Sequence, residues 1–410
     1  MVLSSNTFTQ EKVGQDRLRL AGEYHDLLEE ARRQPGFGDL LRPIKGKDLI
    51  RAARNGPIVV IICHHDRCDA LLLLPGQSNI SHLHLPNFTY DKALSSRSDM
   101  NASLRYMCSR ERGPRRPYQE EFEDCMERML ATLWNDIVKP ILDFLGYTNN
   151  KGGDNLPQIT WCPTGVLSFL PLHAAGDYNQ PGARVFEYTI SSYTPTVTAL
   201  LEHTSSSLNR NHRVLGVGQA NTPGHTPLPG TVQELACLKA HVEAKASYSQ
   251  LTDGQATTTT VLNAMEKHEW VHLACHAHQN VHDPTKSGFF LQDDILDLAA
   301  INQRSFKNKG LAFLSACETA TGDENLPDEA IHLASGMLMA GYRSVIATMW
   351  SVVDEDAPLV ADRVYEKLMK DGGIGNGEVG RALHYAVAAL REHIGEKELG
   401  RWVPYIHMGS

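Results

Sequence analysis

The sequence contains no long hydrophobic run, and this argues against a membrane-spanning segment. Its longest apolar stretches, 58–63 and 70–75, have the length of a β-strand, whereas a transmembrane helix needs roughly 20 apolar residues. The first residues run directly into polar sequence and do not resemble a signal peptide.

An excess of positive charge is missing as well. With a formal net charge of -9, the chain lacks the basic stripe that binds nucleic acid or an anionic membrane surface.

Paired cysteine motifs are also absent. The 8 cysteines are scattered along the chain, and the one close pair, Cys63 and Cys68, does not have the CxxC spacing. No second pair stands at the spacing of a zinc site. We therefore expect free thiols in a reducing compartment, and we predict a cytoplasmic protein, with the nucleus as the other such compartment.

An alternation of strand-like and helix-like segments dominates the second half of the chain. The 410 residues, 42% of them hydrophobic, are enough for a sizeable core. From residue 213 onward, short apolar runs alternate with helical patterns, and this predicts an α/β fold with a parallel sheet covered on both faces. Upstream, the pattern predicts a helix over 14–33, a hairpin over 57–74, a polar loop over 90–117, a helix over 118–145 broken near Pro140 and a strand over 166–172. Thr231 and Glu234 have the spacing of a helix capping box.

Three regions follow from this organisation. Residues 1–40 are the predicted N-terminal helix and linker, residues 41–205 an α/β half, and residues 206–410 a second α/β half that carries the chemistry-bearing residues.

Two predicted strands end in residues that can perform catalysis. The strand over 270–275 is followed by His276, and the strand over 311–316 is followed by Cys317. If the two strands are neighbours, their ends lie about 4.8 Å apart, and an imidazole can meet a thiol there. A thiol attacks a carbonyl as the thiolate, so it needs a base or an imidazolium beside it. The alternative is that Cys317 is a small residue of the core.

The segments around these two residues resemble the catalytic motifs of a known family. His272-Leu273-Ala274-Cys275-His276-Ala277 and the run from Phe313 to Gly322 are similar to the two motifs of CHAT domains, which belong to the caspase–separase–gingipain group of cysteine peptidases. The runs 161–172, 191–196, 326–341 and 347–357 fit the same family, so the resemblance covers about residues 128–405. It is greatest to fungal and bacterial members.

The resemblance implies a caspase-like fold and a covalent mechanism. It makes Cys317 the nucleophile, His276 its acid–base partner, and the backbone N–H groups of Ala277 and Cys317 the oxyanion hole. The family usually has glycine where this chain has Ala277, a change that is tolerable if φ is not positive there. Residues 41–205 would then be a pseudo-protease-like unit. The implied substrate is an intracellular protein bound as an extended strand, in an immune or cell-death type pathway, and no cofactor is required.

Acidic residues follow the catalytic cysteine and the next strand. Glu318, Asp323, Glu324, Asp354 and Asp356, together with Ser315, form the predicted substrate-binding set. An acidic pocket would favour a basic residue on the amino side of the cut. The alternative for Asp356 is a helix cap, because it stands just before Ala357-Pro358.

The sequence offers two alternative functions. The first is a metal site, because five histidines lie close together in the chain: His268, His272, His276, His278 and His282. They include an HxxxH spacing, but the surrounding residues indicate a strand rather than a metal-binding helix, and we predict no metal. A catalytically silent CHAT-like scaffold that binds a protein partner is the remaining alternative; the presence of both Cys317 and His276 speaks against it.

Overall fold

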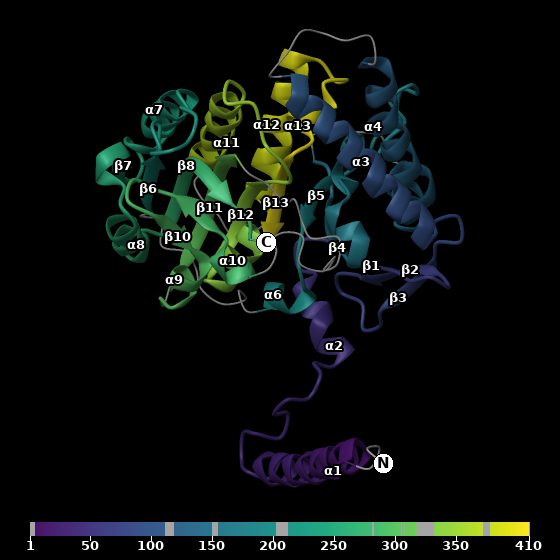
Figure 1. Cartoon of the computed structure of the whole chain (residues 1–410). Coiled ribbons are helices and arrows are strands. Elements are labelled where there is room, and N and C mark those ends of the chain that lie inside the picture. Colours follow the sequence, from purple (N-terminus) through teal and green to yellow (C-terminus); the bar gives the residue numbers. More distant parts are fainter. Residues whose placement is uncertain are drawn as a thin grey trace. The chain divides into compact units, whose positions relative to one another are not determined.

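The structure is a computed structural model that describes most of the chain. The described residues are 5–110, 119–149, 155–201, 212–280, 283–304, 306, 308–317, 332–371 and 378–409. The chain divides into two units, 1–48 and 49–410. The first contains helix α1 (Ser5–Arg32), which confirms the helix predicted over 14–33. In the described part of the chain, every strand belongs to the second unit (Figure 1), and no helix has the length and apolar character needed to cross a membrane.

One mixed sheet runs through the whole second unit. Its strands, in spatial order, are β7 (Ser247–Thr252), β6 (Arg213–Gly218), β8 (Trp270–His278), β11 (Lys309–Cys317), β12 (Tyr342–Thr348), β13 (Tyr405–Gly409), β5 (Ile190–Tyr193), β4 (Gln158–Pro163), β1 (Ile58–Cys63), β2 (Cys68–Leu73) and β3 (Ser81–His84). A hairpin of β9 (Gly288–Phe290) and β10 (Ile295–Asp297) pairs with the end of β8. The predicted hairpin over 57–74 is confirmed as β1 and β2.

The strands run in two opposed groups. β7, β6, β8, β11 and β12 are mutually parallel, so their carboxyl ends meet at one edge of the sheet. β13 is antiparallel to β12 but parallel to β5, and β5, β4 and β1 continue in that direction. The sheet therefore passes through both predicted α/β halves. It is a mixed sheet, with an antiparallel pairing in its interior between β12 and β13 and an antiparallel edge at β2 and β3, and it confirms the predicted α/β fold class.

Helices cover both faces of the sheet (Figure 1). On one face lie α7 (Gly230–Val242), α11 (Ala357–Asp371) and α12 (Glu378–Ile394), and on the other α8 (Thr258–Lys267), α9 (Leu298–Asn302) and α10 (His332–Met339). Beside β1–β4 lie α3 (Tyr90–Arg110), α4 (Gln119–Leu133), the π-helical turn η2 (Trp134–Val138) and α5 (Lys139–Phe144). Shorter helices are α2 (Gly46–Leu49), η1 (Ile50–Ala52), η3 (Tyr147–Asn149), η4 (Gly165–Phe169), η5 (Leu172–Ala174), η6 (Val185–Glu187), α6 (Val197–Leu201), η7 (Asp253–Gln255), η8 (Pro284–Lys286) and α13 (Leu399–Trp402).

The predicted polar loop over 90–117 is wrong where the structure describes it, because residues 90–110 form helix α3. The buried positions of α3 have helical spacing, but three of their five side chains are polar. They are Ala93, Ser96, Arg97, Met100 and Ser103. The Arg97 guanidinium lies 3.2 Å from the centre of the Phe169 ring, a cation–π contact that lets a charged residue face the core. Hydrophobic periodicity alone could not reveal a face of this kind.

Two smaller predictions are also wrong. Residues 166–172 form short 3-10 helices instead of a strand, after a turn in which Gly165 has a φ of 57°. The capping box does not form, because the Thr231 hydroxyl donates to the carbonyl of Leu228 and Glu234 turns into the core toward His272. The helix predicted over 118–145 is present as α4, η2 and α5, with Pro140 in the first turn of α5.

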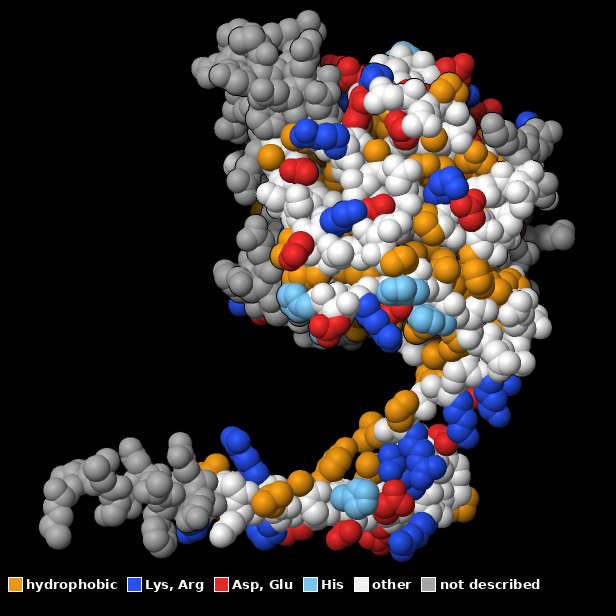
Figure 2. All heavy atoms as spheres, turned by 90° about the vertical axis from the view of Figure 1, so that its right-hand side faces the viewer, with side chains coloured by type: hydrophobic (Ala, Val, Ile, Leu, Met, Phe, Trp, Pro, Cys, Tyr) orange, Lys and Arg blue, Asp and Glu red, His pale blue; other side chains and the backbone are white. Residues whose placement is uncertain are grey.

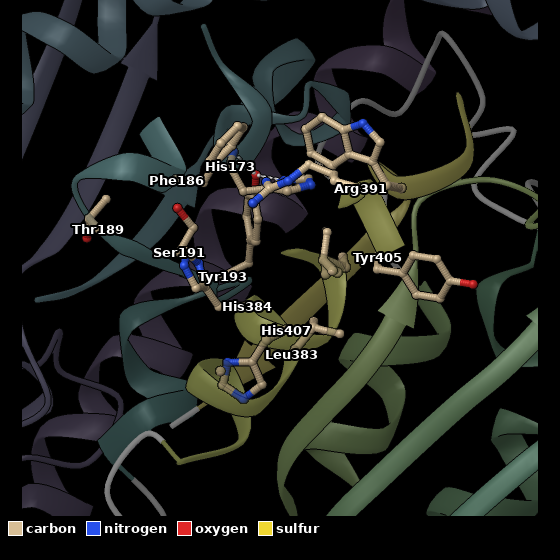
Figure 3. Close-up of a pocket in the computed structure, with 14 residues that line it drawn as sticks. His173, Phe186, Thr189, Ser191, Tyr193, Leu383, His384, Arg391, Tyr405 and His407 are labelled. Carbon is tan, nitrogen blue, oxygen red and sulfur yellow. Dashed lines mark hydrogen bonds between the residues drawn. The ribbon is translucent and has the colours of Figure 1, made fainter. Parts of the chain in front are cut away.

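The strand direction reverses between β12 and β13, and β13 in turn meets β5 at a junction that we call the seam. A single register pair, Met408 with Tyr193, joins these strands. A small cavity of about 40 Å³ opens beside the seam and is lined by residues of β5, β13, α12 and the segments next to them (Figure 3). His407 Nδ1 lies 2.8 Å from Ser192 Oγ, and His173 is held between the Tyr193 hydroxyl and the Val403 carbonyl, each at 2.8 Å.

Burial keeps the histidines of the seam neutral. It lowers the pKa of His173 and of His384 to about 4 and that of His407 to about 3. In the unfolded chain, each pKa would be about 6.5. The unfolded chain therefore binds more protons between these values, and stability falls as the pH drops below about 6.5.

We expect acid to unfold the protein through this seam. At pH 5 each of these histidines should lower the free energy of unfolding by about 2 kcal/mol relative to pH 7. Urea unfolding at the two pH values measures the difference. His407→Gln and His173→Gln should each reduce the pH dependence, whereas His393→Gln, at an exposed position of α12, should not. An unchanged pH dependence in the first two variants would contradict the account of buried neutral imidazoles.

Candidate active site

His276 and Cys317 occupy paired positions at the carboxyl ends of two neighbouring strands. β8 and β11 are parallel, and their register runs from the pair Val271–Ala312 to the pair His276–Cys317. The two strands are neighbours, which is the condition for His276 and position 317 to meet. Paired positions of adjacent parallel strands lie on the same face of a sheet. The backbone therefore places position 317 beside His276, on the face covered by α7 and α11.

The His276 imidazole is held by a backbone carbonyl. Its Nε2 lies 2.8 Å from the carbonyl oxygen of Thr226, in the loop between β6 and α7. Because a carbonyl oxygen only accepts, Nε2 carries the hydrogen, and in the neutral ring Nδ1 is then the nitrogen with a free lone pair. The Thr226 carbonyl thus fixes both the tautomer and the orientation of the ring.

Aromatic rings fill the space on one side of His276. The His225 ring stacks on His276 with centroids 4.9 Å apart and an interplanar angle of 28°, and it also lies 4.2 Å from the Phe290 ring of β9. His225, Thr226 and Phe290 were not among the residues predicted from the sequence. Only the place of His225 and Thr226 in the chain could have indicated them. They lie in the loop 219–229, which follows β6 at the same edge of the sheet as His276.

The same loop is fixed at its far end by Asp354. The Gly230 N–H at the start of α7 donates to Asp354 Oδ2 at 2.6 Å. A Cβ at position 230 would collide with the backbone and side chain of Asp354, so only glycine permits this approach. Asp354 follows β12, the strand beyond β11. Residues from the ends of β6, β8 and β12 are therefore linked around the paired positions 276 and 317.

Comparison with known proteins agrees with this geometry. The sequence profile of the CHAT domain matches residues 127–410. The chain belongs to the CHAT domain family. No curated protein matches this CHAT protein in sequence.

Solved structures show the same fold. Two crystal structures of the Saccharomyces cerevisiae separase–securin complex match with TM-scores of 0.62 and 0.61 at 11% and 12% sequence identity, over 88% of this chain. The match covers 30% of that chain, so the CHAT protein corresponds to less than a third of it. The Arg specific cysteine proteinase gingipain R matches with a TM-score of 0.47 at 12% identity, over 67% of this chain and 68% of that chain. The CHAT protein shares the α/β fold of the matched part of separase.

Ala277 stands where the family usually has glycine, and its backbone does not have the positive φ that would require glycine. Apart from glycine, the described residues with positive φ are Leu41, Asp253 and Asn308, so Ala277 is not strained by its methyl group. Its side chain is 1% exposed, and its backbone pairs with Phe289 of β9. The predicted role of Ala277 in the oxyanion hole stays a prediction.

The predicted substrate-binding residues have different surroundings. Glu318, Asp323 and Glu324 lie outside the described residues. Ser315 is buried in β11, two positions before Cys317, and pairs with Ala274. Asp354 is partly exposed at the carboxyl edge of the sheet, close to the start of α7.

Asp356 is engaged elsewhere in the protein. It is 3% exposed, and its two carboxylate oxygens accept from Arg401 Nε at 2.8 Å and Nη2 at 2.5 Å. A bidentate, buried pair of this kind is among the strongest polar contacts in proteins. Its carboxylate is therefore committed to joining the start of α11 to α13.

The histidines of this run that the structure describes have other partners. No group of three metal-binding side chains that could hold an ion occurs among the described residues, which exclude His282. His272 is fully buried, with Nε2 3.0 Å from Glu234 Oε1 and Nδ1 3.1 Å from the Tyr365 hydroxyl. In His268, Nδ1 lies 2.7 Å from the Ala264 carbonyl oxygen and Nε2 lies 2.9 Å from Ser249 Oγ. Both of these side chains are thus part of the packing.

Cys275 precedes His276 and is fully buried in the main hydrophobic core. Because side chains alternate along a strand, it faces the side of the sheet opposite to His276. It therefore belongs to the core, as expected for a cysteine that serves packing.

The hydrogen bond between His276 and the Thr226 carbonyl predicts the tautomer of His276, which can be measured without a substrate. In protein carrying ¹⁵N-histidine at pH 8, His276 should show the Nε2–H tautomer, with Nδ1 unprotonated. Histidine ¹⁵N chemical shifts distinguish the two nitrogens, and the His276→Gln spectrum assigns the signals. A dominant Nδ1–H tautomer would contradict the placement of Thr226.

Proposed function

We propose that the CHAT protein is a cysteine endopeptidase in which Cys317 is the nucleophile and His276 the general acid and base. The observation that carries this proposal is the register pair of His276 and Cys317 at the carboxyl edge of a caspase-like sheet. The hydrogen bond to Thr226 supports it, because an oriented imidazole is what an adjacent thiol requires.

The proposed mechanism uses the protein's own groups. His276 Nδ1 accepts the proton of the Cys317 thiol, and the thiolate attacks the peptide carbonyl carbon. Backbone N–H groups at Ala277 and Cys317 are the proposed donors to the oxyanion. The imidazolium then returns its proton to the leaving amine, which gives a thioester that water hydrolyses. No cofactor takes part in these steps.

We propose an intracellular protein substrate that binds in an extended conformation, and a cytoplasmic location for the enzyme. Extended binding lets a peptide present one side chain at a time to pockets near the active site. The assignment to an immune or cell-death pathway, which rests on the family resemblance, is part of the same proposal.

We further propose that Asp354 gives the enzyme a preference for a basic residue on the amino side of the cut. Two observations favour Asp354 over Asp356: its partial exposure, and its contact with the loop that holds His276. The Gly230 N–H uses only one lone pair of the Asp354 carboxylate. Its other lone pairs can accept hydrogen bonds from an arginine or lysine side chain. Asp356 is not included, because Arg401 already occupies its carboxylate.

Loss of either member of the dyad should abolish cleavage. Mass spectrometry of new N-termini in a cell lysate should reveal cleavages with the wild type that Cys317→Ala and His276→Ala each remove, and the double variant should be no worse than either, because the two act as a unit. Cys237→Ala and His278→Ala are the controls and should keep most activity. EDTA should leave turnover unchanged.

Two outcomes would overturn the proposal. Cleavage that survives in Cys317→Ala would exclude this cysteine as the nucleophile. A wild-type protein that cuts nothing, yet captures the same binding partner as Cys317→Ala, would favour a silent scaffold.

The preference for a basic residue can be separated from the structural role of Asp354. Asp354→Asn keeps an oxygen that accepts from the Gly230 N–H but removes the charge, so it should fold normally and lose roughly 10–100-fold selectivity for arginine or lysine over apolar residues. Asp354→Ala should lose the hydrogen bond as well and lower cleavage of every substrate. A positional-scanning peptide library gives the measurement. Unchanged selectivity in Asp354→Asn would remove the acidic-pocket proposal and leave the Cys317–His276 assignment intact.

A further inference from the structure

The hairpin of β1 and β2 brings two cysteines face to face. Cys63 and Cys68 are the last register pair before the exposed turn of residues 64–67. The His64 N–H donates to the Arg67 carbonyl at 3.0 Å, so residues 64 and 67 are a hydrogen-bonded pair. In an antiparallel ladder the next pair is then a non-hydrogen-bonded one, in which the two Cα atoms and their side chains approach most closely. Cys63 and Cys68 occupy this pair.

The sulfur atoms of this pair are close together. Their Sγ atoms lie 2.8 Å apart. A disulfide bond is about 2.05 Å long, so a small rotation of the two side chains would bring the atoms to bonding distance. Among the other described cysteines, Cys125 Sγ lies 3.0 Å from Arg128 Nη2, and Cys162 Sγ lies 3.9 Å from the Pro195 carbonyl oxygen.

The outer face of the hairpin holds this arrangement in place. Asp69, next to Cys68, binds Arg67 Nε at 2.8 Å and His82 Nε2 at 2.8 Å, which ties the turn and β3 to β2. Figure 2 looks onto this side of residues 49–410, where histidine side chains gather at the surface. The exposed histidines of the hairpin and β3 are His64, His65, His82 and His84. Solvent therefore reaches the end of the hairpin, while its register stays fixed.

We propose that Cys63 and Cys68 form a reversible cross-strand disulfide, a modification site separate from the proposed active site. The oxidant is a small-molecule disulfide such as oxidised glutathione. The Cys63 thiolate attacks one sulfur of the oxidant and releases one molecule of glutathione, which gives a mixed disulfide. The Cys68 thiolate then attacks the Cys63 sulfur and releases the second molecule. Two thiols of the protein are oxidised, one glutathione disulfide is reduced, and the two protons pass to the released thiolates.

Burial determines the order and the speed of these steps. Cys63 is partly exposed, and Cys68 is 1% exposed, so Cys63 meets the oxidant first and Cys68 resolves the mixed disulfide. Burial raises the pKa of both thiols above the usual value, and the neighbouring charge of Asp69 adds to the effect at Cys68. Few thiolates are present at neutral pH, so formation should be slow there and faster at pH 8.

Trypsin gives a direct test, because it cuts after Arg54, Arg67 and Lys92 and so separates the two cysteines. The full chain is equilibrated at pH 8 with mixtures of reduced and oxidised glutathione, alkylated under denaturing conditions and digested. We expect peptides 55–67 and 68–92 to appear as one linked species, lighter by two hydrogens than their sum, and to separate again in excess reduced glutathione. Recovery of both peptides in alkylated form at every ratio would overturn the proposal, as would a mixed disulfide on Cys63 that never resolves.

Two controls separate native geometry from mere proximity in sequence. In Cys63→Ser and Cys68→Ser the linked species should vanish, whereas Cys237→Ser should leave it unchanged. The equilibrium constant against glutathione should be at least about tenfold larger in the native protein than in guanidinium chloride, a difference of about 30 mV. Equal constants in the two states would show that the fold does not favour the bond, and would overturn the proposal.

Discussion

The parallel pairing of β8 with β11 is the constraint on which the candidate active site depends. A shift of one residue in this register would move His276 to the position opposite a neighbour of Cys317 on the other face of the sheet. The register is fixed by the core on both sides of the strands. At its start, the buried Lys309 ammonium donates to the carbonyls of Met265, Glu266 and His268, at the end of α8, at 2.6–3.0 Å. This binds the beginning of β11 to the turn that leads into β8.

The groups around His276 come from strands that are distant in sequence. The Thr226 carbonyl follows β6, Phe290 lies on β9, and Asp354 follows β12. They meet because parallel strands deliver their carboxyl ends to the same edge, where the chain leaves the sheet and polar backbone groups become available. The loop from β6 to α7 connects them, since it contacts His276 at one point and Asp354 at another.

The rest of the sheet supports this edge from the other side. β13 pairs antiparallel with β12 and meets β5 through one register pair, so it joins the two opposed groups of strands. The seam contains neutral histidines and a guanidinium, Arg391, that lies 3.5 Å from the centre of the Phe186 ring. Burying polar groups of this kind is favourable only while each has a partner, which makes the seam sensitive to protonation.

The sequence by itself determined the fold class, most of the strands and helices, and the two residues proposed for catalysis. These follow from local patterns, because apolar alternation marks the strands, helical spacing marks the amphipathic helices, and the motifs around His276 and Cys317 are contiguous in the chain. Helix α3 escaped this reasoning, because its buried face contains Arg97, whose partner Phe169 lies far along the chain.

Only the tertiary structure decided how the side chains are used. It assigned the carboxylate of Asp356 to Arg401, connected Asp354 to the first residue of α7 and placed the Thr226 carbonyl against His276. It also turned Glu234, which has the spacing of a capping residue, toward His272 in the core. Each of these contacts joins residues more than 35 positions apart in the chain, so no local pattern encodes it. The physical reason is that a polar side chain takes the partner that burial brings to it, and that partner is known only when the sheet and its helices have come together.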